Sequence, residues 1–183
     1  MKIIATITVG LLLSIKGIGQ EFMGVKVGGS KASITSQLVN KGMIKTKSTN
    51  PNTLVFNGYV SDIKVELFVF FTPKTNIAWK FMVYLPKRTN WYELKEDYEK
   101  YLDLFTNKYG TPSSSYNTFL SPYYEGDGYE MSAVELDKCL YSAFWENYSV
   151  EISEYKQVRL GYENSENAKI NTREKNQLNN ANF

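Results

Sequence analysis

Three acidic side chains and two glycines lie in one short stretch of the chain, and this is the pattern whose residue types could most readily bind a ligand or carry out chemistry. The stretch is EGDGYE, Glu125 to Glu130. Carboxylates separated by glycine can wrap around a hard cation such as calcium, which prefers oxygen ligands. The spacing lacks the full pattern of a known calcium loop, so we favour a flexible acidic loop. Calcium binding and a glycosidase-like pair of carboxylates are the alternatives.

The residue types on which many enzymes rely are missing from the chain. It has no histidine, the commonest general base and transition-metal ligand, and its one cysteine is Cys139. A Ser-His-Asp or Cys-His arrangement and a thiolate zinc site are therefore impossible. No phosphate-binding loop, nucleophile elbow or dinucleotide fingerprint occurs, and Cys139 is expected to be a small buried residue. We predict that the protein is not an enzyme and has no cofactor, with calcium as the one weak possibility.

Tyrosine gathers in the second half of the chain, around the acidic stretch. Its side chain supplies rigid, amphipathic contact area at interfaces and against sugar rings, although most tyrosines in small β-rich domains simply cover the core. We choose the loop residues as the candidate contacts with a partner. They are Tyr123, Tyr124, Glu125, Asp127 and Tyr129.

The best-defined helix in the sequence precedes this loop and extends from Asn90 towards Pro112. Asn90 can cap its first turn, and Gly110 followed by Pro112 can end it. Apolar residues at spacings of three and four form one wide stripe, which predicts that the helix packs on a sheet. The stripe contains Trp91, Leu94, Tyr98, Tyr101, Leu102, Phe105 and Tyr109.

Two strands of alternating apolar residues come before this helix, from Ile63 to Phe71 and from Ile77 to Leu85. Their short connection requires antiparallel pairing, which places both apolar rows, Trp79 included, on one side of the sheet. The opposite side is mixed, so it carries either a second layer from the N-terminal half or an aromatic contact surface. Its residues are Lys64, Glu66, Phe68, Phe70, Lys80, Met82 and Tyr84.

The other segments continue an α+β pattern. Strands are predicted at residues 22–27, 43–47, 53–60, 116–120, 140–145, 149–153 and 157–162, and a second helix between Ser30 and Gly42. Residues 121–138 form an acidic, tyrosine-rich insertion, in which only residues 131–136 could make a helical turn or two. The polar, Asn-rich tail at 163–183 predicts a frayed helix or disorder.

The first residues have the parts of a secretory signal peptide. Lys2 precedes an apolar run from Ile3 to Ile15, and the small residues Gly17 and Gly19 come just before Gln20. The apolar run is shorter than the roughly 20 residues that a bilayer requires. We predict a signal peptide at 1–19 with cleavage near Gly19-Gln20, export to the periplasm or beyond, and no retained transmembrane segment.

Charge is balanced but unevenly distributed once the signal peptide is removed. Without Lys2 and Lys16 the basic and acidic residues are equal in number, so nucleic acid binding has no electrostatic basis. Residues 22–61 carry lysines and no acid, whereas residues 121–137 carry acids and no base. We favour two solvated faces; mutual contact and a charged partner are the alternatives.

Two similar halves follow from the order of these elements. Two segments share one order of features: a helix, then Asn-Lys, then a glycine that ends the helix, then polar residues that precede the strands. They are ITSQLVNKGMIKTKS (34–48) and YLDLFTNKYGTPSSS (101–115). We therefore predict one α+β domain at 20–162, with repeat halves at about 22–86 and 90–162. Each half is a helix followed by an antiparallel meander, and the helices pack on one face of an antiparallel sheet.

A family resemblance rests on FMGVKVGGS (22–30), NKG (40–42), Trp91 with KYGTP (108–112), and VRLGY (158–162). In these segments the chain resembles small uncharacterised exported proteins of Bacteroides-type bacteria (Bacteroidetes). The doubled helix-plus-meander is also similar in outline to the β-lactamase inhibitor protein fold (BLIP-like) and to small outer-membrane assembly lipoproteins, which implies a binding role. The chain lacks the inhibitor's paired cysteines and the lipoproteins' N-terminal cysteine, so no site residue is carried over.

These observations predict an exported, non-catalytic binding or assembly module of the cell envelope that contacts a protein or glycan partner. The alternative is a carboxylate-dependent envelope enzyme that acts on carbohydrate or peptidoglycan.

Overall fold

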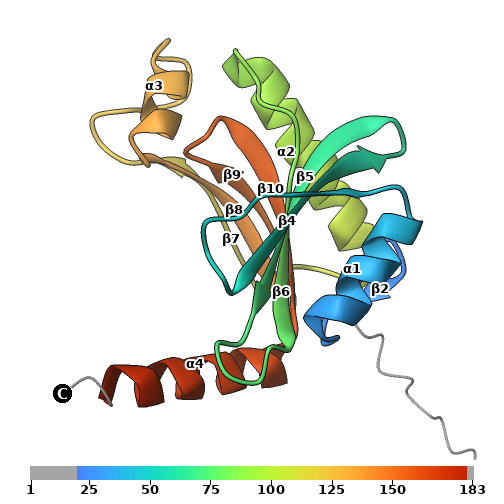
Figure 1. Cartoon of the computed structure of the whole chain (residues 1–183). Helices are drawn as coiled ribbons and strands as arrows, with labels where there is room; N and C mark the ends of the chain where they lie inside the picture. Colours follow the sequence, from blue (N-terminus) through green and yellow to red (C-terminus); the bar gives the residue numbers. More distant parts are fainter. Residues whose placement is uncertain (1–19, 181–183) are drawn as a thin grey trace, which may run out of the picture.

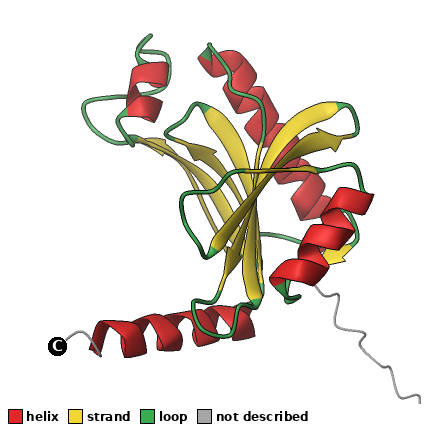
Figure 2. Ribbon diagram, viewed as in Figure 1, coloured by secondary structure: helices red, strands yellow, loops and turns green. Residues whose placement is uncertain are grey.

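The computed structural model describes residues 20–180. The predicted signal peptide and residues 181–183 lie outside this range. Four helices and an eight-stranded antiparallel sheet give the α+β fold that the sequence predicts (Figures 1 and 2). Within the described range, no helix is both long and apolar enough to cross a membrane.

The elements of the large sheet and the helices follow one another along the chain. The strands are β3 (Ile44–Thr46), β4 (Thr53–Val60), β5 (Ile63–Phe71), β6 (Ala78–Tyr84), β7 (Ser114–Phe119), β8 (Cys139–Trp145), β9 (Tyr148–Ser153) and β10 (Gln157–Glu163). The helices are α1 (Lys31–Asn40), α2 (Trp91–Tyr109), α3 (Glu130–Glu135) and α4 (Ser165–Asn180).

A small hairpin replaces the single strand predicted at residues 22–27. Its strands are β1 (Glu21–Phe22) and β2 (Val25–Lys26), which pair with each other. Met23 and Gly24 both have positive φ, 52° and 72°, so the chain reverses between them. Such a reversal at a methionine is a local exception that apolar patterning does not reveal.

The strand order of the large sheet is β3-β4-β5-β6-β10-β9-β8-β7. The first four strands form one meander and the last four form another, and β6 pairs antiparallel with β10 where they meet. Within the described residues, β3 and β7 are therefore the two edges. Each of α1 and α2 is followed in the chain by four strands of this sheet.

Alternation along the strands gives the sheet two unlike faces. We call one the helix face, because α1, α2 and the β1–β2 hairpin pack on it; Leu67, Val83 and Leu160 point to this side. Ile34 and Leu38 bring α1 to the same core. We call the other the open face, because α1 and α2 do not cover it (Figure 2). This is the mixed side that the sequence predicts.

Helix α2 has the caps and the packing that its sequence predicts. Asn90 Oδ1 accepts a hydrogen bond from Glu93 N at 2.9 Å, and Gly110 ends the helix with a φ of 84°. The Phe105 ring lies among aromatic rings of the sheet, with centroids 5.7 Å from Trp145 and 5.8 Å from Tyr162. The aromatic stripe is therefore part of the core.

One expected row of side chains is interrupted in β6. Phe81 and Val83 point to the helix face as predicted, but the pairing with β5 shifts register between Phe70 and Phe71. Ala78 is consequently buried, and the Trp79 ring lies 6.0 Å from that of Phe70 instead of joining the Phe81 row. A β-bulge changes the alternation, and nothing in the apolar pattern reveals it.

The Asn-rich tail forms α4, where the sequence predicts a frayed helix or disorder. The helix lies across one end of the sheet (Figure 1). Asn164 Oδ1 accepts from Asn167 N at 3.0 Å, and Asn167 Nδ2 donates to the carbonyl of Ala78 at 3.0 Å. Polar contacts rather than an apolar stripe attach this helix, which is why a search for amphipathicity misses it.

Candidate functional site

The acidic loop folds around its own carboxylates. Asp127 accepts hydrogen bonds from the backbone N–H groups of Tyr124, at 3.0 Å, and Tyr129, at 2.7 Å. Glu130 accepts from Gly126 N at 2.7 Å. In the described part of the chain, no three carboxylate or thiol side chains are grouped so that they could share a metal ion. Calcium binding stays an alternative to the prediction of no cofactor, and calorimetric titration with calcium would decide between them.

Glu125 attaches the loop to the rest of the domain. Its carboxylate accepts from Lys95 Nζ, from Tyr141 Oη at 2.9 Å and from Trp91 Nε1 at 3.4 Å. The bond from Lys95 is the main reason that the pKa of Glu125 lies below its ordinary value, and the bonds from Tyr141 and Trp91 act in the same direction. Glu125 is therefore ionised at neutral pH and acts as an anchor.

The five candidate contact residues thus divide into two groups. Glu125 and Asp127 hold the loop in place, while the side chains of Tyr124 and Tyr129 are about two-thirds exposed, at 65% and 64%. Tyr123 is half-buried. Only the two exposed tyrosines offer free aromatic surface to a partner.

No ion pair joins the lysine-rich segment at residues 22–61 to the acidic segment at residues 121–137 in the part of the chain that the structure describes. Among the ion pairs of the described residues, Glu125 pairs with Lys95 and Glu135 pairs with Lys156. None of these pairs joins residues 22–61 to residues 121–137.

A concave region, unlike the projecting acidic loop, lies on the open face of the sheet. It is a hollow of about 510 Å³ whose floor is formed by side chains of β5 and β6. Phe68, Phe70 and Tyr84 make this floor, with Phe68 and Tyr84 meeting edge to face at 5.3 Å and Phe68 and Phe70 stacked at 6.4 Å. All three are only half-buried. The alternation of the strands directs them away from the core, because Leu67, Val69 and Val83 point the other way.

One rim of the hollow is the turn between β3 and β4. The Asn50 side chain accepts from Asn52 N at 2.8 Å, and the Ser48 hydroxyl accepts from Asn50 N at 3.2 Å. Lys31 of α1 donates to the carbonyl of Pro51 at 2.8 Å, which ties the turn to the helix. The side chains of Ser48, Thr49 and Asn50 therefore line the hollow from a fixed turn.

The other rim comes from residues far along the chain. Lys87 follows β6, Tyr155 lies in the turn between β9 and β10, and Gln157 begins β10. The Lys87 ammonium lies 5.9 Å from the centre of the Tyr155 ring. Among the lining residues, Glu66 is the one carboxylate and Lys87 the one cation. The lining is thus mainly aromatic, amide and hydroxyl.

An ion pair beside the hollow joins β9 to β10. Arg159 Nη2 lies 2.7 Å from Glu151 Oε2, and Ser149 Oγ donates to the same carboxylate at 2.8 Å. Arg159 is the cross-strand neighbour of Tyr84. Burial raises the pKa of Tyr84, although the Arg159 cation acts against this effect. Tyr84 is therefore a neutral phenol that can donate a hydrogen bond.

A second hollow, of about 270 Å³, adjoins the first along the open face. The two share Glu66, Tyr84, Lys87 and Gln157. Together they form what we call the open-face groove.

Cys139, which the sequence analysis expects to be a small buried residue, is buried. Burial raises the pKa of its thiol to about 12, so the thiolate that a nucleophile would need is absent at neutral pH.

Sequence patterns located only part of the groove. They placed Phe68, Phe70 and Tyr84 on the mixed side of the sheet, which was expected to carry either a second layer or an aromatic contact surface. They missed Tyr155 and Gln157, whose place beside β6 depends on the pairing of β6 with β10. Comparisons of the chain with models of protein families, with curated proteins and with solved structures find no match, so the assignment of the site depends on its geometry.

Proposed function

We propose that this protein is an exported, non-catalytic binding module of the cell envelope whose ligand lies along the open-face groove. The observation that carries the proposal is the floor of three half-buried aromatic side chains in a hollow of about 510 Å³. Aromatic side chains without core partners on a concave surface are typical of ligand sites.

A neutral glycan fits the chemistry of this groove best. A sugar ring has an apolar C–H face that can stack on Phe68 or Phe70, and hydroxyl groups that can pair with the amides and hydroxyls of the rim. Asn50 and Gln157 supply amides at opposite rims. The lining of the two hollows holds one carboxylate, Glu66, and two cations, Lys64 and Lys87, so it offers little to a strongly charged ligand.

The shortage of carboxylates favours binding over hydrolysis. A glycosidase normally needs two carboxyl groups on either side of the scissile bond. In the groove, Glu66 is the one acidic side chain. The nearby Glu151 is held by Arg159 and Ser149. An enzyme that uses carboxylates remains the alternative.

The exposed tyrosines of the loop supply a second contact surface, suited to a protein partner. Tyr124 and Tyr129 project from a loop fixed by Asp127 and Glu125. In an envelope assembly, this loop would contact the protein while the groove holds the glycan. Alanine at both tyrosines should leave folding unchanged and weaken only that contact, which crosslinking in the native cell would measure.

The architecture is compatible with a tandem origin. We propose that residues 22–86 and 90–162 are copies of one helix-plus-meander unit. The two meanders extend outward from the central β6–β10 pair in mirrored order, which supports this idea. The resemblance in outline to the BLIP-like fold and to exported Bacteroides-type proteins stays a prediction.

Calorimetric titration with neutral oligosaccharides tests the groove. The probes are maltohexaose, cellohexaose and N-acetylchitohexaose. We expect saturable binding of at least one of them, and a loss of about tenfold or more in affinity for Phe68→Ala, because one aromatic stacking contact is worth about 1.5 kcal/mol. Tyr92→Ala is the matched control, since Tyr92 is an exposed aromatic residue on α2.

Two results would contradict the proposal. Absence of binding for all three probes would remove the glycan ligand, and unchanged affinity in Phe68→Ala would move the site elsewhere. Release of shorter sugars from the same probes would favour the enzyme. Export is checked separately by sequencing the N-terminus of protein recovered from the envelope, which should begin at Gln20.

A further inference from the structure

The two edges of the large sheet are protected to different degrees. The β3 edge has three residues and carries Lys45. The β7 edge has six residues, Ser114–Phe119, and carries no charge, proline or glycine. Natural proteins usually protect a free strand edge by shortness, charge or proline, because an unprotected edge pairs with another strand. The β7 edge is therefore available for pairing.

The register of β7 shows which backbone groups point outward. Leu120 N donates to Lys138 O at 2.8 Å, in line with the Thr118–Leu140 and Tyr116–Ser142 pairs. In an antiparallel ladder the hydrogen-bonding residues alternate. The N–H and C=O groups of Ser115, Asn117 and Phe119 consequently point away from β8, towards the outside of the sheet.

These three outward residues are spaced symmetrically about Asn117. We propose that β7 pairs antiparallel with β7 of a second copy of this chain, about a two-fold axis at Asn117. Asn117 then faces Asn117 of the second copy, and Ser115 faces Phe119 of the second copy. Each of these pairs exchanges both backbone hydrogen bonds, so every outward group of the strand finds a partner.

The distribution of charge favours a second copy over a charged partner. A two-fold axis places each residue near its own symmetry mate, so any charge close to the axis would face a like charge. Residues 111–124, which include β7 and the segments on both sides of it, carry no charge at all. On the open face the pairing also sets Tyr116 opposite Thr118 of the second copy, an aromatic and β-branched pair.

Exposed apolar side chains on β7 and just after it enlarge the contact. Tyr116 and Leu120 are 52% and 39% exposed, and Tyr124 follows in the loop. The interface would still lie at the small end of the range for protein complexes, where association is weak and depends on concentration.

Analytical ultracentrifugation over a range of protein concentrations tests the proposal, together with hydrogen exchange. We expect a monomer–dimer equilibrium, and slower exchange of the Ser115, Asn117 and Phe119 amides as concentration rises. The Tyr116 and Thr118 amides, which face β8, should be protected at all concentrations. Asn117→Pro removes an N–H that β8 does not use and should abolish the dimer without unfolding the chain. Asn117→Ser keeps that N–H and should still dimerise.

Disulfide trapping gives an independent readout. Asn117→Cys should form a covalent dimer on oxidation, because facing residues in such a pair have Cα atoms about 5.5 Å apart. Ser36→Cys, at an exposed position on α1, should not be trapped. The proposal is overturned if the protein stays monomeric throughout, or if Asn117→Pro dimerises as well as the unchanged chain. If the protein stays monomeric, an extended segment of another protein becomes the alternative partner of the β7 edge.

Discussion

At the scale of single residues, the acidic side chains that resemble ligands prove to have structural partners. Asp127 closes its own loop, and Glu125 joins that loop to α2 and β8. Among the five candidate contact residues of the loop, the ones with free surface are instead Tyr124 and Tyr129.

Replacing Glu125 with glutamine tests the anchoring role of its charge. We expect Glu125→Gln to lower the free energy of unfolding at pH 7 by about 0.5–1 kcal/mol, the usual worth of a partly exposed ion pair. The pKa of Glu125 is lowered in the folded state, mainly by the bond from Lys95. The contribution is therefore complete above the ordinary carboxyl pKa, about 4.3, and is lost as pH falls through the folded pKa.

Urea denaturation at neutral and acid pH measures this difference. The gap between the two proteins should close at acid pH, where the unchanged chain is itself protonated at Glu125. Glu146→Gln is the control, because Glu146 forms none of the ion pairs found among residues 20–180. A gap of equal size at both pH values would show that the charge is not its cause.

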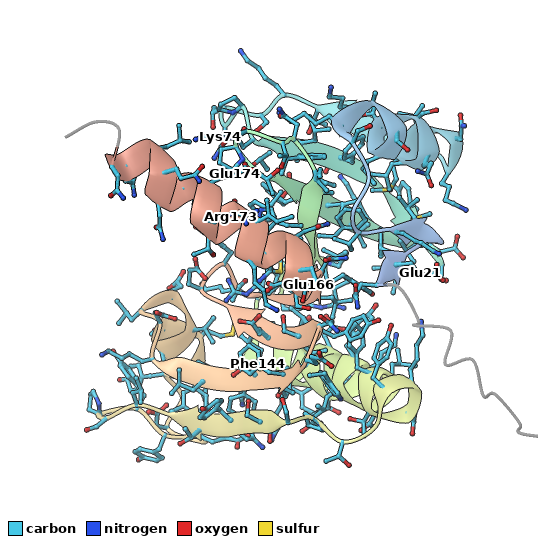
Figure 3. The ribbon with its side chains drawn as sticks, turned by 90° about the horizontal axis from the view of Figure 1, so that it is seen from below. Glu21, Lys74, Phe144, Glu166, Arg173 and Glu174 are labelled. Atoms are coloured by element: carbon cyan, nitrogen blue, oxygen red, sulfur yellow. The ribbon has the colours of Figure 1, made fainter. Side chains whose placement is uncertain are left out.

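At the scale of elements, α4 is the helix whose attachment is least expected. Its Glu174 reaches the turn between β5 and β6, where it accepts from Lys74 N at 2.7 Å and from Thr75 N at 3.2 Å and Oγ1 at 2.8 Å (Figure 3). Glu174 is buried, with 5% of its surface exposed. Burial opposes its ionisation, but these hydrogen bonds outweigh burial and lower its pKa.

Glu174→Ala should release the second half of α4. We expect faster hydrogen exchange in that half and a loss of about 1–3 kcal/mol in the free energy of unfolding, the usual worth of partly buried hydrogen bonds to a charged acceptor. Because the pKa of Glu174 is lowered on folding, the same release should occur in the unchanged chain as pH falls through the folded pKa.

The matched control lies on the same helix. Glu166 pairs with Lys169, and both side chains are exposed, so Glu166→Ala should change hydrogen exchange little. Slow exchange throughout α4 in Glu174→Ala would mean that Asn164 and Asn167 hold the helix alone.

At the scale of the whole molecule, the two meanders share one core. β6 pairs with β10 at the centre of the sheet, and the Phe22 ring of the first half lies 5.8 Å from the Tyr162 ring of the second. Phe105 of α2 meets the same tyrosine at 5.8 Å. Neither half can expose its side of this junction without uncovering apolar surface of the other.

We therefore expect the described domain to unfold in one cooperative transition. Trp79 reports on the first half and Trp145 on the second, so two variants that each keep only one of these tryptophans should show the same midpoint in urea by fluorescence. Phenylalanine replaces the other tryptophans, and far-ultraviolet circular dichroism confirms that each variant is folded. Different midpoints would mean that the halves unfold separately.

The sequence by itself determined the parts of this protein that depend on neighbouring residues. Asn90, Gly110 and a stripe at spacings of three and four specify α2, because capping and amphipathicity act within a few residues. Alternation and short turns likewise predict β4, β5, β9 and β10 closely. The mixed side of Phe68 and Phe70 could be recognised as unusual by the same argument.

Only the tertiary structure decided how these parts meet. The pairing of β6 with β10 brings Gln157 and Tyr155 beside Tyr84, and no local pattern shows which distant strands will be neighbours. The bulge that moves Trp79 and the polar attachment of α4 likewise depend on contacts between segments far apart in the chain. The groove and the free β7 edge exist because strand order places them there, and strand order is set by the free energy of the complete core.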